Sequence, residues 1–381
     1  MDLPCVSCKR IPSQSGHAPS CPLAISFASF SQRDFSGVSS NICIGSYGYP
    51  RVRVGLLSSH QPALDHPKEL ALRSLPEIIF ARSSLINSFH VVPVEKQDSF
   101  LSLAQLVAQA KKPSEVELSL EKVPIFRLQH PPGSPPHGAS VGLKKASLLG
   151  NVKVSSFVEK VLSDELSASE QLKKLSVRLD EHAQTKLLTA GLLGSDKRLV
   201  PTRWGITAVD DMRSLDILAS VKQFPCYNVY SVFFFSHFGN SFLIACFPHQ
   251  WQFSLREYAL DSRKHVPPTV DYESWNGRST YAKNTSGAYY AARVAVVEWL
   301  RSQRRQASVL VLRFISDAYT APLGVWVIRE GVRTAFSSSP LSFSSQELLL
   351  RYISLRMKQF GVVEDLSSSP LIRGLSQRTL F

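Results

Sequence analysis

Four potential metal ligands lie within the first 21 residues, and this feature limits the fold of the chain more than any other. They form the pattern Cys5-x2-Cys8-x8-His17-x3-Cys21. Thiolate and imidazole ligands at this spacing suit tetrahedral Zn²⁺, with the first pair in a tight turn and the second pair closing the loop. Cys43 is the alternative to His17 as the fourth ligand. The pattern predicts a structural zinc site, because four protein ligands leave no position open for a substrate.

The distribution of the cysteines also indicates the compartment. Four of the six lie in the first 43 residues, whereas a secreted disulfide scaffold is shorter and more evenly studded with cysteine. The N-terminus MDLPCVSCKR lacks the apolar core of a signal peptide. The most apolar stretch, residues 227–247, is cut by polar residues into runs too short to span a bilayer. We therefore expect a cytoplasmic protein with no membrane segment.

The charge balance favours a polyanionic partner. The chain has 43 Lys and Arg against 30 Asp and Glu, a formal net charge of +13. Contacts between such cations and phosphates release counterions and so favour binding to nucleic acid, although charge alone does not separate DNA from RNA. The 44% hydrophobic content is typical of a folded protein.

Helical patterns over about 156–193 are followed by strand and helix patterns from residue 227, which predicts an α+β fold: a small zinc-bound N-terminal segment followed by a mixed helix and antiparallel-sheet body. Residues 128–150 contain several prolines and glycines and suggest a hinge. We expect a zinc-binding segment over 1–40, an α+β region over 41–135, a main α+β domain over 136–361 and a flexible tail over 362–381.

Local patterns predict individual elements within this body. Ser156–Glu159 and Ser167–Glu170 match capping boxes at helix starts. Two apolar runs flank residues 236–240, which predicts a buried hairpin with a five-residue loop. Apolar residues at helical spacing predict helices over residues 289–305 and from residue 344 to about 360.

A candidate active site centres on Arg203 and Trp204. A guanidinium binds phosphate through two hydrogen bonds, and an indole ring stacks on a base or sugar. Asp210 and Asp211, with Glu273, supply carboxylates for a hydrated Mg²⁺, as a nuclease or nucleotidyl-transfer site requires. The alternative for the paired aspartates is a capping role at the start of a helix that follows them.

Two other basic segments are candidate phosphate-binding sites. Arg51 and Arg53 alternate with valines on a short strand, so both guanidiniums point to one face; the alternative is a solvated basic face of a half-buried strand. Arg278 and Lys283 lie in a loop rich in glycine and hydroxyl residues, just before a predicted helix. This arrangement suits a phosphate or nucleotide at the helix N-terminus, or a capped loop with no chemical role.

Several segments, spread in order along the whole chain, match one family. They are CVSCK, IGSYGYPRVRVGLL, KKPSEVELSLEK, KASLLGNVKVSSFVEKVLSDE, AGLLGSDKRLVPTRWGITAVDD, GRSTYAKNTSGAYYAARVAVVEWL, RQASVLVLR and PLGVWVIRE. Together they resemble the archaeal Nre family of DNA-repair proteins. The resemblance implies a role in DNA repair with DNA as a partner, and it supplies no reaction. The family's N-terminal motif usually has another cysteine before the final Cys-Pro; this chain has none, and His17 is the expected substitute.

The resemblance also implies a peptide at the C-terminus that binds the sliding clamp (PCNA). Such peptides follow the pattern Gln-x-x-Leu-x-x-aromatic, and here Gln377, Leu380 and Phe381 match it in part. The pattern is shortened, because Phe381 follows Leu380 directly. The alternative is a frayed terminus that happens to contain glutamine.

Three functions remain open from the sequence. The first is a DNA-repair factor that binds DNA and is recruited by the clamp. The second is a Mg²⁺-dependent nuclease or nucleotide-processing enzyme. The third is an RNA-binding or RNA-processing protein that uses the same basic charge and aromatic residues.

Overall fold

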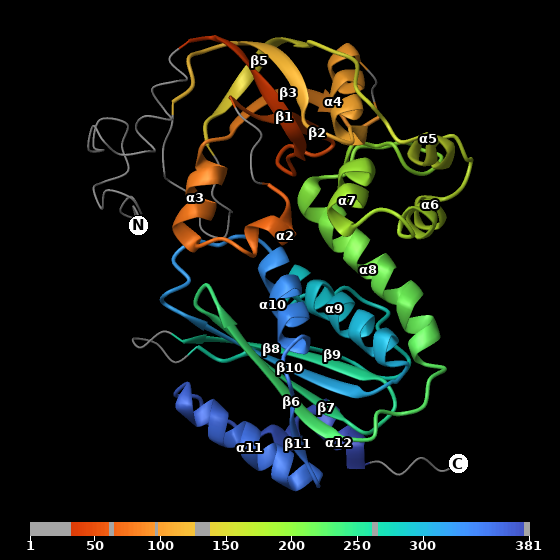
Figure 1. Ribbon diagram of the computed structural model, residues 1–381, viewed down its shortest axis with the longest axis vertical. Helices are drawn as coiled ribbons and strands as arrows, with labels where there is room; N and C mark the ends of the chain where they lie inside the picture. The colour runs from red at the N-terminus through yellow and green to blue at the C-terminus, as the bar shows by residue number, and fades with distance from the viewer. Residues whose placement is uncertain (1–31, 61–64, 96–97, 126–137, 261–265, 377–381) are drawn as a thin grey trace. The chain divides into compact units, whose positions relative to one another are not determined.

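A computed structural model describes residues 32–60, 65–95, 98–125, 138–260 and 266–376. The chain divides into two compact units. The first comprises Met1–Met212 with Ala321–Gly324, and the second comprises Arg213–Thr320 with Val325–Phe381. Both combine helices with a sheet, so the predicted α+β class is confirmed (Figure 1).

The first unit is built on a closed five-stranded barrel in the order β1-β2-β3-β5-β4. Its strands are β1 (Asp34–Ile44), β2 (Arg51–Ser59), β3 (Ile86–Pro93), β4 (Ser114–Leu120) and β5 (Ser140–Leu148). The pairs are antiparallel except for the parallel pair β3–β5. Side chains alternate between the two faces of each strand, so Val52, Val54 and Leu56 fill the barrel core. Helix α4 (Ser99–Gln109) adds its apolar side chains to the same core.

Six further helices begin in the described part of the first unit. They are α2 (Pro67–Leu70), α3 (Leu75–Ser83), α5 (Ser156–Leu162), α6 (Ala168–Leu175), α7 (Glu181–Thr189) and α8 (Thr202–Val221), of which α8 continues into the second unit. The capping box at Ser167 and Glu170 is present at the start of α6. Helix α7 begins after Asp180, whose side chain accepts a hydrogen bond from the amide of Ala183.

The second unit contains a six-stranded sheet in the order β11-β6-β7-β10-β8-β9. The strands are β6 (Tyr230–His237), β7 (Asn240–Phe247), β8 (Gln252–Leu260), β9 (Thr269–Glu273), β10 (Ser308–Ser316) and β11 (Leu341–Phe343). Strands β8 and β10 are parallel, because a crossover through α9 (Gly287–Gln303) joins this part of the chain. Among the described strands each unit therefore has one parallel pair, so both sheets are mixed, whereas an antiparallel sheet was expected.

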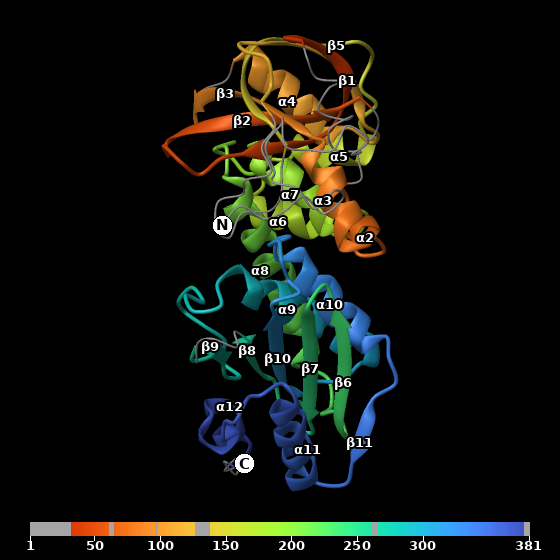
Figure 2. The same cartoon turned by 90° about the vertical axis from the view of Figure 1, so that its left-hand side faces the viewer.

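Helices cover both faces of this second sheet (Figures 1 and 2). On β10, Val309 and Val311 face α9 and α10 (Trp326–Phe336), while Leu310 and Leu312 belong to the opposite core. The opposite core includes α11 (Gln346–Gln359), η1 (Leu366–Ser368) and α12 (Pro370–Ser376). Both faces of the sheet are thus buried, which explains the continuous apolar runs in its strands.

Three sequence expectations differ from the structure in detail. The hairpin β6–β7 turns at Phe238 and Gly239, both with positive φ, so its loop has two residues rather than five. The expected boundaries are the second difference: residues 140–148 of the hinge expected over 128–150 form β5, which pairs with β4 in the same barrel, and residue 40 lies inside β1.

The third difference concerns the C-terminal region. The tail expected to be flexible from residue 362 instead forms η1 and α12, where Leu366, Leu371 and Ile372 are buried. None of the helices in the described part of the chain is long and apolar enough to cross a membrane.

Candidate functional site

The residues expected at the two ends of the chain fall outside the described segments. These are the zinc ligands Cys5, Cys8, His17 and Cys21 and the clamp-binding residues Gln377, Leu380 and Phe381. Cys43, the alternative zinc ligand, lies on β1 and is half-buried beside the side chain of Thr202. Burial raises the pKa of its thiol. Within the described ranges, no group of three or more His, Cys, Asp and Glu side chains is placed to hold a metal.

The start of β2 presents two arginines to solvent. Arg51 and Arg53 are exposed, whereas Val52 and Val54 between and beyond them are buried, as the alternation predicts. The Arg53 guanidinium lies 4.5 Å from the centre of the Phe89 ring on β3. This cation–π contact stabilises the guanidinium against the sheet surface and leaves its edge open to solvent.

Trp204 and Tyr49 form an exposed aromatic pair. Their ring centres lie 5.3 Å apart at 51°, and the two residues are 48% and 49% exposed. Trp204 is in the first turn of α8, and the hydroxyl of Thr202 fixes that turn by accepting a hydrogen bond from the amide of Ile44 at 2.8 Å. Tyr47, in the same loop as Tyr49, is 87% exposed.

Arg51 lies two residues after Tyr49, and Arg203 directly precedes Trp204. We refer to these residues together as the Tyr49–Trp204 face: Tyr47, Tyr49, Arg51, Arg203 and Trp204. Both arginines are exposed, and neither forms an ion pair with any carboxylate in the described segments. The Tyr49–Trp204 face therefore combines accessible aromatic rings with guanidiniums that are open to an external anion.

Unlike Arg51 and Arg203, Arg198 forms ion pairs with acidic side chains. Its Nη2 atom lies 3.1 Å from Glu95 and its Nε atom lies 3.8 Å from Asp196. Its charge is thus balanced within the chain.

The paired aspartates lie in the interior of a helix. Helix α8 begins at Thr202, so Asp210 and Asp211 are in its third turn, and the alternative that they cap a helix is wrong. Asp210 is fully buried and Asp211 is half-buried. Successive positions on a helix point about 100° apart, so the two carboxylates do not converge on one ion.

The carboxylate of Glu273 is occupied by partners within the second unit. Its Oε2 atom is 2.8 Å from Arg293 Nη1, and its Oε1 atom accepts a hydrogen bond from Trp251 Nε1 at 3.0 Å. Both Glu273 and Arg293 are buried. Asp210 and Asp211 belong to the first unit and Glu273 to the second.

The predicted phosphate loop before α9 is held by its own arginine. Arg278 donates to the carbonyls of Tyr272 at 2.8 Å, Thr280 at 3.2 Å and Tyr281 at 3.3 Å, and its Nη2 atom lies 3.1 Å from Asp271. This pattern is that of a structural arginine. Lys283 remains exposed.

The structure also assembles a polar cluster that the sequence analysis missed. It lies where α2, α3 and α7 meet β1 in the first unit, and we call it the α7 cluster. Its members are Asp65, His66, Arg82, Asp180, His182 and Lys186, all half-buried. His182 and Lys186 are four residues apart on α7, and this spacing on one helix face is the only sequence pattern that points to the cluster.

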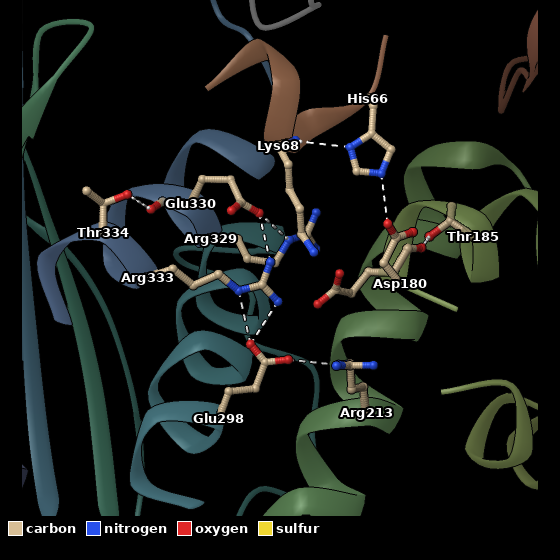
Figure 3. Close-up of polar contacts among 11 residues, drawn as sticks. His66, Lys68, Asp180, Thr185, Arg213, Glu298, Arg329, Glu330, Arg333 and Thr334 are labelled. Carbon is tan, nitrogen blue, oxygen red and sulfur yellow. Dashed lines mark hydrogen bonds and ion pairs between the residues drawn. The ribbon is translucent and has the colours of Figure 1, made fainter. Parts of the chain in front are cut away.

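Two contacts with β1 and two contacts of His66 define the geometry of the α7 cluster. His66 Nε2 is 2.8 Å from Asp180 Oδ2 (Figure 3), and the His66 and His182 rings lie 5.2 Å apart. Lys186 Nζ donates to the carbonyl of Ser40 at 3.3 Å, and the Ser40 hydroxyl donates to Asp65 Oδ2 at 2.9 Å. The cluster therefore places two imidazoles, an amine and two carboxylates beside one strand.

A second charged network lies in the second unit and has a structural character. Glu298 on α9 accepts from Arg213 Nε at 2.9 Å and from Arg333 Nη2 at 2.8 Å, and Arg333 also reaches Glu330 at 2.8 Å (Figure 3). Ion pairs of this kind connect α8, α9 and α10 within the second unit, which is consistent with a structural role.

Comparison with known proteins gives the family. The archaeal Nre N-terminal model matches residues 17–263, and the archaeal Nre C-terminal model matches residues 273–381. No solved structure matches the chain significantly.

Three relatives agree with this assignment. DNA repair protein NreB of Archaeoglobus fulgidus is 32% identical over 92% of both chains, and DNA repair protein NreA of the same organism is 35% identical over 84% of both. DNA repair protein NreA of Haloferax volcanii is 32% identical over 79% of this chain and 78% of its own. The chain belongs to the archaeal Nre family.

Proposed function

We propose that this protein acts in DNA repair and binds DNA through the Tyr49–Trp204 face. The relatives named above are DNA repair proteins by name, which supports the process. The observation that carries the proposed binding surface is the exposed contact between Tyr49 and Trp204. Large aromatic rings that touch one another and remain half exposed are typical of interaction sites.

The chemistry of this face favours unpaired bases. Aromatic side chains gain most from bases that are not already stacked in a duplex, and arginines beside them bind the phosphates between those bases. Arg51 and Arg203 supply these cations, and the net charge of +13 adds a long-range attraction. We therefore expect tighter binding to single-stranded or gapped DNA than to intact duplex.

Fluorescence anisotropy with a labelled single-stranded oligonucleotide tests the proposal. Trp204→Ala should weaken binding by about 1–3 kcal/mol, the usual loss for one stacked base. Leu355→Ala and Arg351→Ala are matched controls, since both alter exposed residues of α11 in the second unit. They should leave the affinity unchanged.

Two results would overturn this assignment. Equal affinity of the wild-type protein and Trp204→Ala would remove the Tyr49–Trp204 face as the binding surface. Tighter binding to RNA of the same sequence would move the function to RNA.

We further propose that Gln377, Leu380 and Phe381 recruit the protein to the sliding clamp (PCNA), and that Cys5, Cys8 and Cys21 hold a structural Zn²⁺ with His17 as the fourth ligand. The spacing of the cysteines supports the zinc site. The partial match of the last residues to a clamp-binding peptide supports the recruitment.

A further inference from the structure

Lys186 is half-buried, and the hydrogen bond that its amine forms within the described part of the first unit is long. Its Nζ atom donates to the Ser40 carbonyl at 3.3 Å, and no carboxylate in the described ranges lies within ion-pair distance of it. Lysines removed from solvent usually form an ion pair, because an unpaired ammonium loses its hydration. This lysine therefore departs from a purely structural role.

The groups around Lys186 are those that amine chemistry requires. Ser40 accepts from Lys186 through its carbonyl and donates to Asp65 Oδ2 at 2.9 Å through its hydroxyl. The next residue, Asn41, has its Nδ2 atom 3.4 Å from His182 Nε2. Two adjacent residues of β1 thus bring an amine, a carboxylate and an imidazole to one place.

Burial sets the protonation of two of these groups. Desolvation lowers the pKa of Lys186, against the opposing effect of Asp65 and Asp180. Desolvation also lowers the pKa of His182 to about 4, so this imidazole is neutral at neutral pH. A neutral imidazole accepts a proton, and a desolvated lysine is the usual nucleophile toward carbonyl groups.

We propose that Lys186 is a nucleophilic amine that forms an imine with an aldehyde, and that its substrate is the ring-opened sugar of an abasic site in DNA. The aldehyde chemistry follows from the α7 cluster itself. The choice of a DNA aldehyde rests on the proposed function. An abasic sugar also lacks the base that would otherwise block access to C1′ in a half-buried site.

The reaction balances without any oxidant or reductant. The neutral amine attacks C1′ and forms a C–N bond, while the carbonyl oxygen takes up the proton that the amine loses. The resulting hydroxyl takes a second proton, the one that the Lys186 ammonium gave to Asp65 when it became neutral, and leaves as water, so that a protonated imine remains. His182 then takes a proton from C2′, and the C3′–O bond breaks with departure of the 3′ phosphate. Hydrolysis of the imine restores Lys186 and releases the sugar remnant.

Borohydride trapping on the full chain tests the proposal. The wild-type protein is mixed with a labelled single-stranded oligonucleotide that carries one abasic site, and borohydride reduces any imine to a stable secondary amine. We expect a covalent adduct that peptide mass spectrometry places on Lys186. Lys186→Arg should lose the adduct, and Lys160→Arg, an exposed lysine on α5, should retain it.

His182→Gln separates the two chemical steps. It should still form the trapped adduct, because imine formation needs the amine and Asp65 but not this imidazole. Strand cleavage at the abasic site should fall by about 100-fold or more, the usual contribution of a general base. Equal cleavage by His182→Gln and wild type would overturn the role of His182 as the base.

Locating the trapped adduct in wild-type protein by peptide mass spectrometry tests the role of Lys186 even if Lys186→Arg folds poorly. An adduct on other amines only, or no adduct with any aldehyde, would overturn the proposal.

A parallel sample with propanal and a binding assay with an oligonucleotide without abasic sites keep the two proposals distinct. Labelling of Lys186 by propanal without oligonucleotide binding would retain the amine site and remove DNA binding. Oligonucleotide binding without any labelling of Lys186 would retain the proposed DNA binding and exclude the amine site.

Discussion

His66 Nε2 lies 2.8 Å from Asp180 Oδ2, although the two residues are 114 positions apart in the chain. Each of them also caps a helix. His66 Nδ1 accepts a hydrogen bond from the amide of Lys68 at the start of α2 (Figure 3), and Asp180 Oδ1 accepts one from the amide of Ala183 at the start of α7. One ion pair therefore joins the N-termini of two helices in the first unit.

This pair makes the stability of the first unit depend on pH. The hydrogen bond to Asp180 raises the pKa of His66 above its ordinary 6.5. Burial opposes ionisation of Asp180, but the hydrogen bonds from His66 and Ala183 prevail and hold its pKa well below 3.8. The His66 contribution is complete below pH 6.5 and disappears as pH rises through the raised pKa, while the Asp180 contribution disappears in acid.

Urea unfolding at about pH 5.5 and about pH 8.5 measures this effect. Wild-type protein should lose more free energy of unfolding between the two pH values than His66→Gln. Asp98→Ala is a matched control, because Asp98 caps α4 through the amide of Leu101 without a histidine partner. It should cost about 1 kcal/mol at both pH values. The same pH dependence in wild type and His66→Gln would contradict the assignment.

The variant Glu273→Gln distinguishes a structural role of this carboxylate from a role as a catalytic metal ligand. Because Arg293 is buried with it, Glu273→Gln leaves a buried guanidinium without its counter-charge and should lower the free energy of unfolding by on the order of 3 kcal/mol. Glu347→Gln, on the exposed side of α11, should have little effect. A metal ligand would behave differently: Glu273→Gln would then keep the wild-type melting temperature and lose a metal-dependent activity.

The arginines of the Tyr49–Trp204 face should appear in the salt dependence of DNA binding. Each phosphate contact contributes about one to the slope of log affinity against log salt. Arg51→Ala and Arg203→Ala should each reduce that slope by about one, whereas Arg278→Ala should leave it unchanged because Arg278 bonds to its own loop. Anisotropy titrations at several salt concentrations give the slopes. An unchanged slope for Arg51→Ala and Arg203→Ala would show that neither contacts phosphate.

The proposed zinc site predicts about one metal ion per chain in protein purified without added zinc. Replacing Cys5 and Cys8 together with serine should remove this zinc, and Cys226→Ser, at an exposed position in the second unit, should retain it. Zinc is measured by elemental analysis. Full zinc content in the double variant would exclude these ligands. Loss of zinc in Cys43→Ser but not in His17→Ala would assign Cys43 as the fourth ligand.

The clamp-binding proposal is tested by removing residues 377–381. This truncation keeps α12, whose Leu371 and Ile372 are buried, so the second unit should remain folded. Binding to the sliding clamp of the same organism, measured by calorimetry, should fall below detection. Phe381→Ala should weaken it by about 2 kcal/mol, the contribution of one buried aromatic side chain. Equal clamp binding by the full-length and truncated chains would exclude this peptide.

Sequence patterns predicted those elements whose formation depends on residues close together in the chain. The capping box at Ser167 and Glu170 and the helical spacing over 289–305 both depend on neighbours within a few residues, and both appear in the structure. The start of α8 was misplaced for the same reason. Asp210 and Asp211 resemble capping residues, whereas the true start at Thr202 depends on a hydrogen bond from Ile44, which is 158 residues away in sequence.

The α7 cluster was hidden from the sequence because its members come from distant segments. His66 reaches Asp180 across 114 residues, and Lys186 reaches Ser40 across 146. No spacing rule connects such pairs, and only the barrel and its helices bring them together. The Tyr49–Trp204 face was found in part: Arg51, Arg203 and Trp204 were singled out by their chemistry, but Tyr49 joined them only when the ring contact was known.

The closure of the first unit's barrel has a consequence for amide hydrogen exchange. Every barrel strand has a neighbour on both sides, so its amides become exchangeable mainly when the whole barrel opens. The second sheet ends in β11 and β9, which have one neighbour each and can fray separately. Deuterium uptake should therefore be late and uniform along β1–β5, but graded across the second sheet, fastest at β11 and β9 and slowest at β7 and β10.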